Sequence, residues 1–147
     1  MPKPVPAPFL TLPWPDRALH PNARPHWTKL RKAAREARHM GQLLALEAGW
    51  HLVELPAGKL HVWWTFDPPN LSRKRDDDGL LSSMKPYRDG IADALKIDDH
   101  LFVSHPYLSD QPHPGGRVIV RISAAPVMPE AVPLEAFEPK KPRRAVR

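Results

Sequence analysis

One long stretch of helical periodicity, from about His26 to Ala48, constrains the fold more than any other feature of the sequence. Apolar residues recur there at i, i+3 and i+4 spacing, which predicts a single amphipathic helix. Its apolar stripe consists of Leu30, Ala33, Ala34, Ala37, Met40, Leu44 and Ala48. A chain of 147 residues suits one domain with a modest core. We therefore expect this helix to be a main element of a single domain.

Four shorter segments have the composition of strands. The segment KLHVWWTF at 59–66 alternates and is rich in β-branched and aromatic residues, so we expect it to be a central strand. The other three are FLTLPW at 9–14, which prolines end, residues 101–108, and residues 117–123, which follow a Gly115-Gly116 turn.

A second helix is expected between the strands at 59–66 and 101–108, with Ile91, Ala94 and Leu95 among its apolar members. It begins or bends at Pro86, which has no backbone N–H to donate. The resulting order of strand, helix, strand, helix, strand, strand predicts an α+β fold with two main helices against a small mixed sheet of about four strands. Around this domain at 9–123, we expect a flexible lead-in at 1–8 and a proline-rich basic tail at 124–147.

Composition restricts the classes of protein that fit the chain. No apolar run of about 18 residues occurs and the N-terminus lacks a long apolar segment, so we expect neither a transmembrane helix nor a signal peptide. The absence of cysteine excludes disulfides and thiolate zinc sites, and the eight histidines lack the i, i+4 pairing of a helical zinc site. A cytoplasmic protein without a membrane partner or a small-molecule cofactor is the simplest interpretation.

The charge of the chain is positive and unevenly distributed. A net charge of +6 favours an anionic partner, of which nucleic acid is the commonest. Part of the excess lies in the tail KKPRRAVR at 140–147. The helix at 26–48 also has a cationic stripe, made of Lys29, Arg31, Lys32, Arg35 and Arg38. Such a face can simply be solvated, but Glu36 is the only acid between Thr28 and Gln42, and this imbalance of sign favours a binding surface.

The segment RKRDDDGLLSSMK at 73–85 combines three consecutive aspartates with flanking cations. If the chain is extended there, Asp76 and Asp78 point to one side and the aspartate between them to the other. Close carboxylates repel each other, and a divalent ion such as Mg²⁺ relieves the repulsion and leaves positions for phosphate and water. The later pair Asp98-Asp99 can join them if both segments lie at the same edge of the sheet. The alternative is structural, with Asp78 as a helix N-cap and Asp98 or Asp99 as turn residues.

Lys85 follows Asp78 by seven residues, close to two turns of a helix, so the two share a face if the segment is helical. Its ammonium group could then approach a phosphate bound at the acidic site. The alternative is an i, i+4 ion pair with Asp89, and the two roles can coexist.

Several of these segments together resemble the RusA-type Holliday junction resolvases, which come chiefly from phages and prophages. The resemblance covers residues 9–123 and is carried by LPW, PNARPHW, the basic helix, RDDDGLLSSMKPYRDGIADAL and IDDHLFV, in that order. It implies a homodimeric RusA-like fold in which Asp76, Asp78 and Asp99 correspond to the metal-binding aspartates and Lys85 to the catalytic lysine. Gly79 stands where the family usually has asparagine, which could loosen the turn after the acidic pair. The lysine also lies a few residues farther from the aspartates than in the shortest members.

The resemblance implies hydrolysis of DNA phosphodiesters with Mg²⁺ or Mn²⁺, by a homodimer that cuts two strands of a four-way junction in recombination and repair. Cations would hold the backbone phosphates, and the candidates are Arg24, Lys29, Arg31, Lys32, Arg35, Arg38, Arg73, Lys74 and Arg75. Two alternatives remain open. One is a basic DNA-binding accessory protein without catalysis, and the other is a metal nuclease that acts on flaps or other branched DNA.

Overall fold

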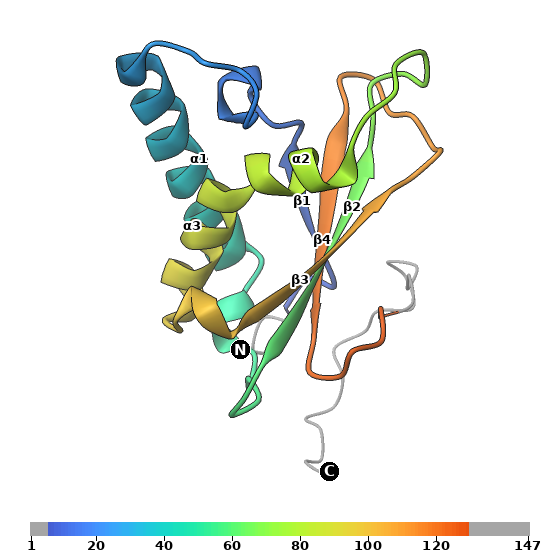
Figure 1. Cartoon of the computed structure of the whole chain (residues 1–147). Coiled ribbons are helices and arrows are strands. Elements are labelled where there is room, and N and C mark those ends of the chain that lie inside the picture. The colour runs from blue at the N-terminus through green and yellow to red at the C-terminus, as the bar shows by residue number, and fades with distance from the viewer. Residues whose placement is uncertain (1–5, 130–147) are drawn as a thin grey trace.

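The structure is a computed structural model and describes residues 6–129 (Figure 1). Its strands are β1 (Leu10–Pro13), β2 (Leu60–Asp67), β3 (Phe102–Leu108) and β4 (Arg117–Ser123), and its helices are α1 (Trp27–Glu47), α2 (Asp77–Ser83) and α3 (Lys85–Leu95). Between them lie three short 3₁₀ turns, η1 (Arg17–Leu19), η2 (Trp50–Leu52) and η3 (Asp99–Leu101). The predicted order of elements is confirmed, and the expected second helix proves to be two helices, because the chain turns at Met84.

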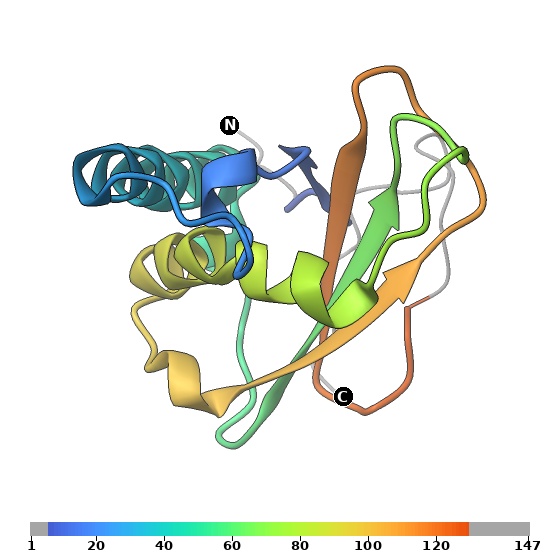
Figure 2. The ribbon, with the colours of Figure 1, turned by 45° about the horizontal axis from the view of Figure 1, so that its top comes forward.

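The four strands form one mixed sheet in the order β1-β4-β2-β3. β2 pairs with β4 antiparallel and with β3 parallel, so the prediction that residues 59–66 form a central strand is confirmed. Parallel neighbours need a crossover connection, and α2 and α3 supply it between β2 and β3. The three helices lie over the same face of the sheet, as Figures 1 and 2 show. The α+β class predicted from the sequence is confirmed.

The core lies between the helices and the sheet face that they cover. Side chains of β2 alternate between the two faces. The buried ones are Leu60, Val62, Trp64 and Phe66, and the partly exposed ones are His61, Trp63 and Thr65. From the helical side, Met84 and Ile91 complete the core and are fully buried. No helix of the described residues covers the opposite face of the sheet, the open face that carries His61 and Trp63.

α1 and α3 pack closely because glycines lie at their contact. A Cβ at Gly41 of α1 would collide with the carbonyl oxygen of Tyr87, and a Cβ at Gly90 of α3 would collide with the carbonyl oxygen of Arg38. The distance between two packed helices depends on the size of the side chains at the contact, so glycine permits the closest approach. This contact fixes which face of α1 is buried.

The predicted apolar stripe of α1 is wrong at two positions. The residues of α1 that are buried are Ala33, Ala37, Gly41 and Ala45. Leu30 and Met40 are instead 40% and 39% exposed. The close contact with α3 selects the row of small residues, and the larger apolar side chains lie beside it.

The start of the described chain is held against the end of α1. The backbone N–H of Ala7 donates to the carbonyl of Ala48 at 2.8 Å, and Nε1 of Trp50 donates to the carbonyl of Ala7 at 2.9 Å. Residues 6–8 of the expected lead-in are therefore anchored. Residues 1–5, and residues 130–147 of the expected tail, lie outside the described residues. Within the described part, no helix combines the length and apolar character needed to cross a membrane.

Candidate functional site

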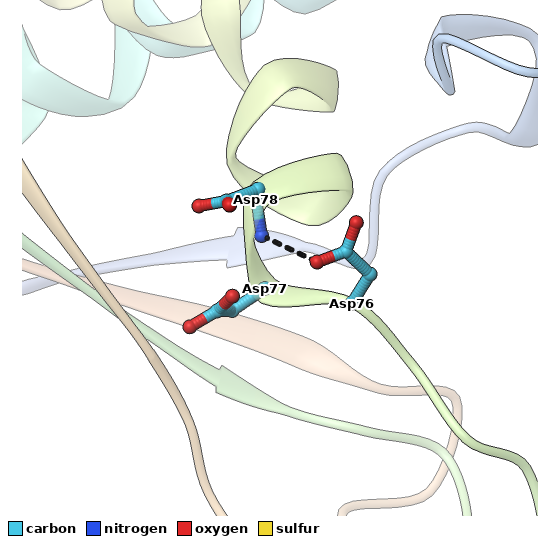
Figure 3. A group of neighbouring side chains, drawn as sticks. All are labelled: Asp76, Asp77 and Asp78. Atoms are coloured by element: carbon cyan, nitrogen blue, oxygen red, sulfur yellow. Dashed lines mark hydrogen bonds between the residues drawn. The ribbon is translucent and has the colours of Figure 1, made fainter.

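The three consecutive aspartates form the start of α2. Asp76 is the N-cap, and its Oδ1 accepts a hydrogen bond from the backbone N–H of Asp78 at 3.2 Å (Figure 3). Asp77 and Asp78 occupy the first helical turn, where unpaired N–H groups and the helix dipole stabilise negative charge. In Figure 3 the carboxylates of Asp77 and Asp78 point to one side of the turn, while that of Asp76 lies on the other side. The capping role considered for Asp78 thus belongs to Asp76.

The helix start brings all three carboxylates together. One oxygen from each of Asp76, Asp77 and Asp78 lies within 4.8 Å of the others, and all three residues are exposed. Mg²⁺ binds oxygen at about 2.1 Å, so oxygens that share one ion lie up to about 4.2 Å apart. The group therefore fits a small hard cation after slight side-chain rotation. The expectation of an extended chain with Asp77 on the opposite side is wrong, because the smaller rise of a helix gathers consecutive residues.

Asp99 lies elsewhere in the same chain. It begins η3, and its Oδ2 is 3.6 Å from Nη2 of Arg88 on α3. α3 has 11 residues and connects α2, before its start, to η3, after its end, as Figures 1 and 2 show. Among the described residues, the group of acidic side chains that could hold a metal ion does not include Asp99. The structure therefore does not bring the third predicted aspartate to the first two within one chain.

Asp98, the neighbour of Asp99, has a structural role. Its Oδ1 accepts a hydrogen bond from the backbone N–H of His100 at 3.1 Å and lies 2.9 Å from Nδ1 of the same residue. The hydrogen bond from the His100 side chain is the main cause that lowers the pKa of Asp98 below its ordinary value. The turn role considered for Asp98 is confirmed.

Lys85 is not on the helix that Asp76 caps. α2 ends at Ser83, the backbone turns at Met84, and Lys85 is the first residue of α3. The expected shared face with Asp78, two turns along one helix, is therefore wrong. The alternative ion pair is confirmed, since Nζ of Lys85 lies 3.3 Å from Oδ2 of Asp89. It is a weak interaction, because the lysine side chain is 61% exposed.

A cavity of about 630 Å³ opens beside Asp76. Two loops form most of its wall, residues 14–23 between β1 and α1 and residues 69–76 between β2 and α2. Four cations line it, namely Arg17, Arg73, Lys74 and Arg75. Among residues 6–129, none of these four has a carboxylate within ion-pair distance. The lining contains two carboxylates, Asp16 and Asp76, so the cavity is positively charged where it borders the acidic turn.

Part of this wall is held in place before any ligand binds. Nη1 of Arg75 donates to the carbonyl of Asn70 at 2.8 Å, and its guanidinium lies 5.6 Å from the centre of the Trp14 ring. Trp14 in turn packs edge-on against Phe66 of the core. Arg75 is thus oriented by contacts that reach down to the sheet.

The cations predicted on and before α1 have different surroundings. Four are exposed and have no ion-pair partner among the described residues, namely Lys29, Arg31, Lys32 and Arg35. Arg24 lies in the preceding loop with a left-handed backbone, at φ 69°. Arg38 differs, because its Nε and Nη2 donate to Asp93 of α3 at 2.7 and 2.9 Å. The hydrogen bond from Arg38 lowers the pKa of Asp93, and Arg38 therefore fastens α1 to α3.

Two residues of this region have no clear signal in the sequence. Asp77 joins the acidic group only because a helix begins there. His20 lines the cavity although it lies in a distant part of the chain. Only the richness of its loop in basic and turn-forming residues could have drawn attention to it.

Comparison with known proteins gives two results. No family model matches the chain. An uncharacterized protein of Xylella fastidiosa (strain Temecula1) is 50% identical over 115 residues, which are 78% of this chain and 74% of that protein. At this identity and coverage, the chain belongs to the same family as the Xylella protein.

Proposed function

We propose that the protein is a metal-dependent endodeoxyribonuclease of the RusA type that resolves four-way DNA junctions. One observation carries the proposal: three carboxylates that converge within 4.8 Å adjoin a cavity with four cations that have no acidic partner among the described residues. Carboxylate oxygens suit a hard divalent cation, and unpaired arginine and lysine suit phosphate. Metal-assisted hydrolysis of a phosphodiester uses both kinds of group side by side.

Asp76, Asp77 and Asp78 would hold the metal ion, Mg²⁺ or Mn²⁺. When bound there, the ion would polarise the phosphate and supply an activated water. The chain itself would hold the strand, with Arg73, Lys74 and the oriented Arg75 against its phosphates. Such contacts position DNA without reading its bases, which suits a nuclease that recognises the shape of its substrate.

Lys85 would stabilise the charge that develops in the transition state. Its pair with Asp89 is exposed and weak, so the side chain can turn toward a bound strand at little cost. It is positioned at the junction of α2 and α3, directly after the turn at Met84.

A homodimer would suit a four-way junction, because two equal sites match the approximate two-fold symmetry of that substrate. It also bears on Asp99. This residue pairs with Arg88 and is not part of the acidic group among the described residues of its own chain. As a third metal ligand it would come from the second copy.

Replacing aspartate by asparagine in the acidic turn tests the proposal. Asp76→Asn keeps an N-cap of equal quality but removes one charge, and Asp78→Asn does the same without touching the cap. We expect both variants to abolish cleavage of a synthetic four-way junction in Mg²⁺. Binding of the junction should be unchanged or stronger, because less negative charge faces the phosphates. Gel assays of nicked product and of bound junction measure the two effects.

The control is Glu54→Gln, which removes an exposed carboxylate outside the cavity. This variant should cut the junction as the wild type does. Cleavage at the wild-type rate by either aspartate variant would reject the assignment of the site.

A non-catalytic DNA-binding protein is the second candidate, and the structural roles of the acidic residues favour it. Asp76 caps α2, Asp99 pairs with Arg88, and Asp89 pairs with Lys85, so each of these carboxylates has a partner without a metal. This candidate predicts metal-independent binding and no nicked product in Mg²⁺ or Mn²⁺. Assays on a junction, a flap and a linear duplex separate it from a nuclease, and they also reveal a nuclease that prefers other branched DNA.

A further inference from the structure

His20 reaches the acidic turn from the loop before α1. The point that a Cβ of Gly79 would occupy lies 3.0 Å from Nε2 of His20 and 3.4 Å from Oδ2 of Asp76, so the ring nitrogen and the carboxylate oxygen border the same gap. The ring of His20 also lines the basic cavity. His20 therefore lies at the boundary between the acidic turn and the cavity.

The ring of His20 is fixed in orientation and in the position of its proton. Its Nδ1 accepts a hydrogen bond from the backbone N–H of Asn22 at 3.1 Å. The backbone of His20 is held as well, since its N–H donates to Arg17 at 3.1 Å and its carbonyl accepts from Ala23 at 3.0 Å. A neutral imidazole whose Nδ1 accepts carries its proton on Nε2. Nε2 is therefore a hydrogen-bond donor and has no lone pair for a metal ion.

The surroundings of this donor favour an anion. Among the residues that the structure describes, the side chain of His20 makes only the hydrogen bond with Asn22. One of the two carboxylates in the cavity wall is engaged locally, because Oδ1 of Asp16 accepts from the backbone N–H of Ala18 at 2.8 Å. Among residues 6–129 none of the four cations of the wall has a carboxylate within ion-pair distance, although Arg75 donates to the carbonyl of Asn70. A directional N–H donor and unpaired cations around one cavity are the chemistry that recognises phosphate.

We infer that the cavity holds a backbone phosphate of the bound DNA strand and that His20 donates a hydrogen bond from Nε2 to one of its oxygens. That the bound strand is DNA rests on the proposed function. The inference adds His20 to the residues that bind this DNA. Arg73 and Lys74 supply charge, while His20 supplies a neutral, directional donor on the side of the cavity next to Asp76. A phosphate held there lies between the cations and the acidic turn.

Binding of a fluorescent four-way junction to the full chain in EDTA, measured by anisotropy, tests the inference without cleavage. His20→Phe keeps a flat ring and removes the donor, whereas His20→Gln keeps an amide N–H. We expect His20→Phe to weaken binding about tenfold and His20→Gln to stay within about threefold of the wild type. The matched control is His51→Phe, at an exposed histidine outside the cavity, which should bind as the wild type does.

The dependence of binding on salt distinguishes a neutral donor from a cation. A neutral donor releases no counterion, so the slope of log affinity against log salt should be the same in His20→Phe and in the wild type. Arg73→Gln should reduce that slope by about one charge. A reduced slope in His20→Phe would mean that the imidazole binds as a cation, which overturns the assignment of a neutral donor.

Gly79→Ala is an independent second variant. The added methyl group lies 3.0 Å from Nε2, so the ring has to shift by a few tenths of an ångström, while alanine itself favours the helix. It should reproduce the loss of affinity of His20→Phe, and the double variant should lose no more than either single one. Wild-type binding by both single variants, with circular dichroism unchanged, overturns the inference. If the variants differ in binding as expected but the wild type never nicks a junction in Mg²⁺, the inference is supported and the proposed function is contradicted.

Discussion

Among single residues, Gly79 stands out because asparagine is usual at this position in the RusA pattern. The structure gives a physical reason for glycine, since a Cβ there would lie in tight contact with the ring of His20, 3.0 Å from Nε2. The hydroxyl of Ser83 donates to the carbonyl of Gly79 at 3.0 Å, in a buried position, and so ties the first turn of α2 to the next.

A cluster of rings on the open face of the sheet contains two neighbouring histidines. Nδ1 of His61 and Nε2 of His105 are 2.8 Å apart, and the ring of His105 stacks on Trp63 with centroids 4.0 Å apart. Arg121 is the cross-strand neighbour of Trp63. Burial, with a smaller effect from the charge of His61, lowers the pKa of His105 below the ordinary 6.5. The folded chain therefore favours a neutral His105.

We expect acid to destabilise the fold through His105. Because its pKa is lower in the folded chain than in the unfolded chain, the unfolded state binds more protons below about pH 6.5, and stability falls as the pH falls through that value. The melting temperature of His105→Asn should therefore drop less than that of the wild type, by a few degrees, between about pH 8 and about pH 5.5. Thermal melts of His51→Asn, at an exposed histidine, should show the full drop. Equal drops in His105→Asn and the wild type would contradict the role of His105.

Among the elements, the break between α2 and α3 has the largest consequence for the site. Met84 leaves helical geometry at φ −91° and ψ 0°, and its buried side chain anchors the turn in the core. Pro86 then occupies the first turn of α3, where a missing N–H removes no hydrogen bond. The sequence left open whether the helix begins or bends at Pro86. The structure combines the two, because the chain bends at Met84 and α3 begins at Lys85. The break places Lys85 and the acidic turn on different helices.

The contact between α1 and α3 leads to a prediction about stability. A Cβ at Gly90 would meet backbone atoms of α1, the carbonyl of Arg38 and the nitrogen of Gln42. Backbone cannot move aside as the end of a side chain can, so Gly90→Ala should lower the free energy of unfolding by about 2 kcal/mol or more, despite the higher helix propensity of alanine. Chemical denaturation measures this difference.

Gly58→Ala is the matched control for Gly90→Ala. Nothing lies within 4 Å of a Cβ added at Gly58, so its free energy of unfolding should stay within about 0.5 kcal/mol of the wild type. A Gly90→Ala variant as stable as the wild type would contradict the prediction, because α1 and α3 would then have to move apart at no cost in free energy.

For the whole molecule, the position of Asp99 determines whether one chain can complete the proposed metal site. Asp99 begins η3, after α3, and its Oδ2 lies 3.6 Å from Nη2 of Arg88. Among the described residues, the acidic group that could hold a metal ion does not include Asp99. One way to complete a site that uses both groups is to draw them from two copies of the chain.

Co-expression of two inactive variants tests whether the site is shared. When Asp76→Asn and Asp99→Asn are co-expressed, a mixed dimer has one intact shared site and one site with both defects. About half of the dimers are mixed, so we expect about a quarter of the nicking of the wild type, measured on a labelled junction. Co-expressed Asp76→Asn and Asp78→Asn have both defects in the same group and should stay inactive. An inactive mixture of Asp76→Asn and Asp99→Asn would exclude a site shared between copies.

The local patterns of the sequence predicted most of the fold. The strand at 117–123 matches β4 residue for residue, and α1 begins and ends within a residue of the expected 26–48. Strand alternation, helical periodicity and turn residues depend on neighbours a few positions away, so they can be read without the rest of the chain. The composition of the acidic group can also be read from local sequence, because its three aspartates are consecutive.

Tertiary packing decided what local patterns do not contain. Leu30 and Met40 follow the helical period but are exposed, because the contact with α3 selected the row of small residues that includes Gly41. His20 borders the acidic turn because two loops meet at one end of the sheet. Asp99 begins η3 after α3 and pairs with Arg88, outside the acidic group. By itself the sequence determined the elements, their order and the composition of the acidic turn. The tertiary structure alone decided which distant side chains meet, since that depends on how closely helices approach and where each loop crosses the sheet.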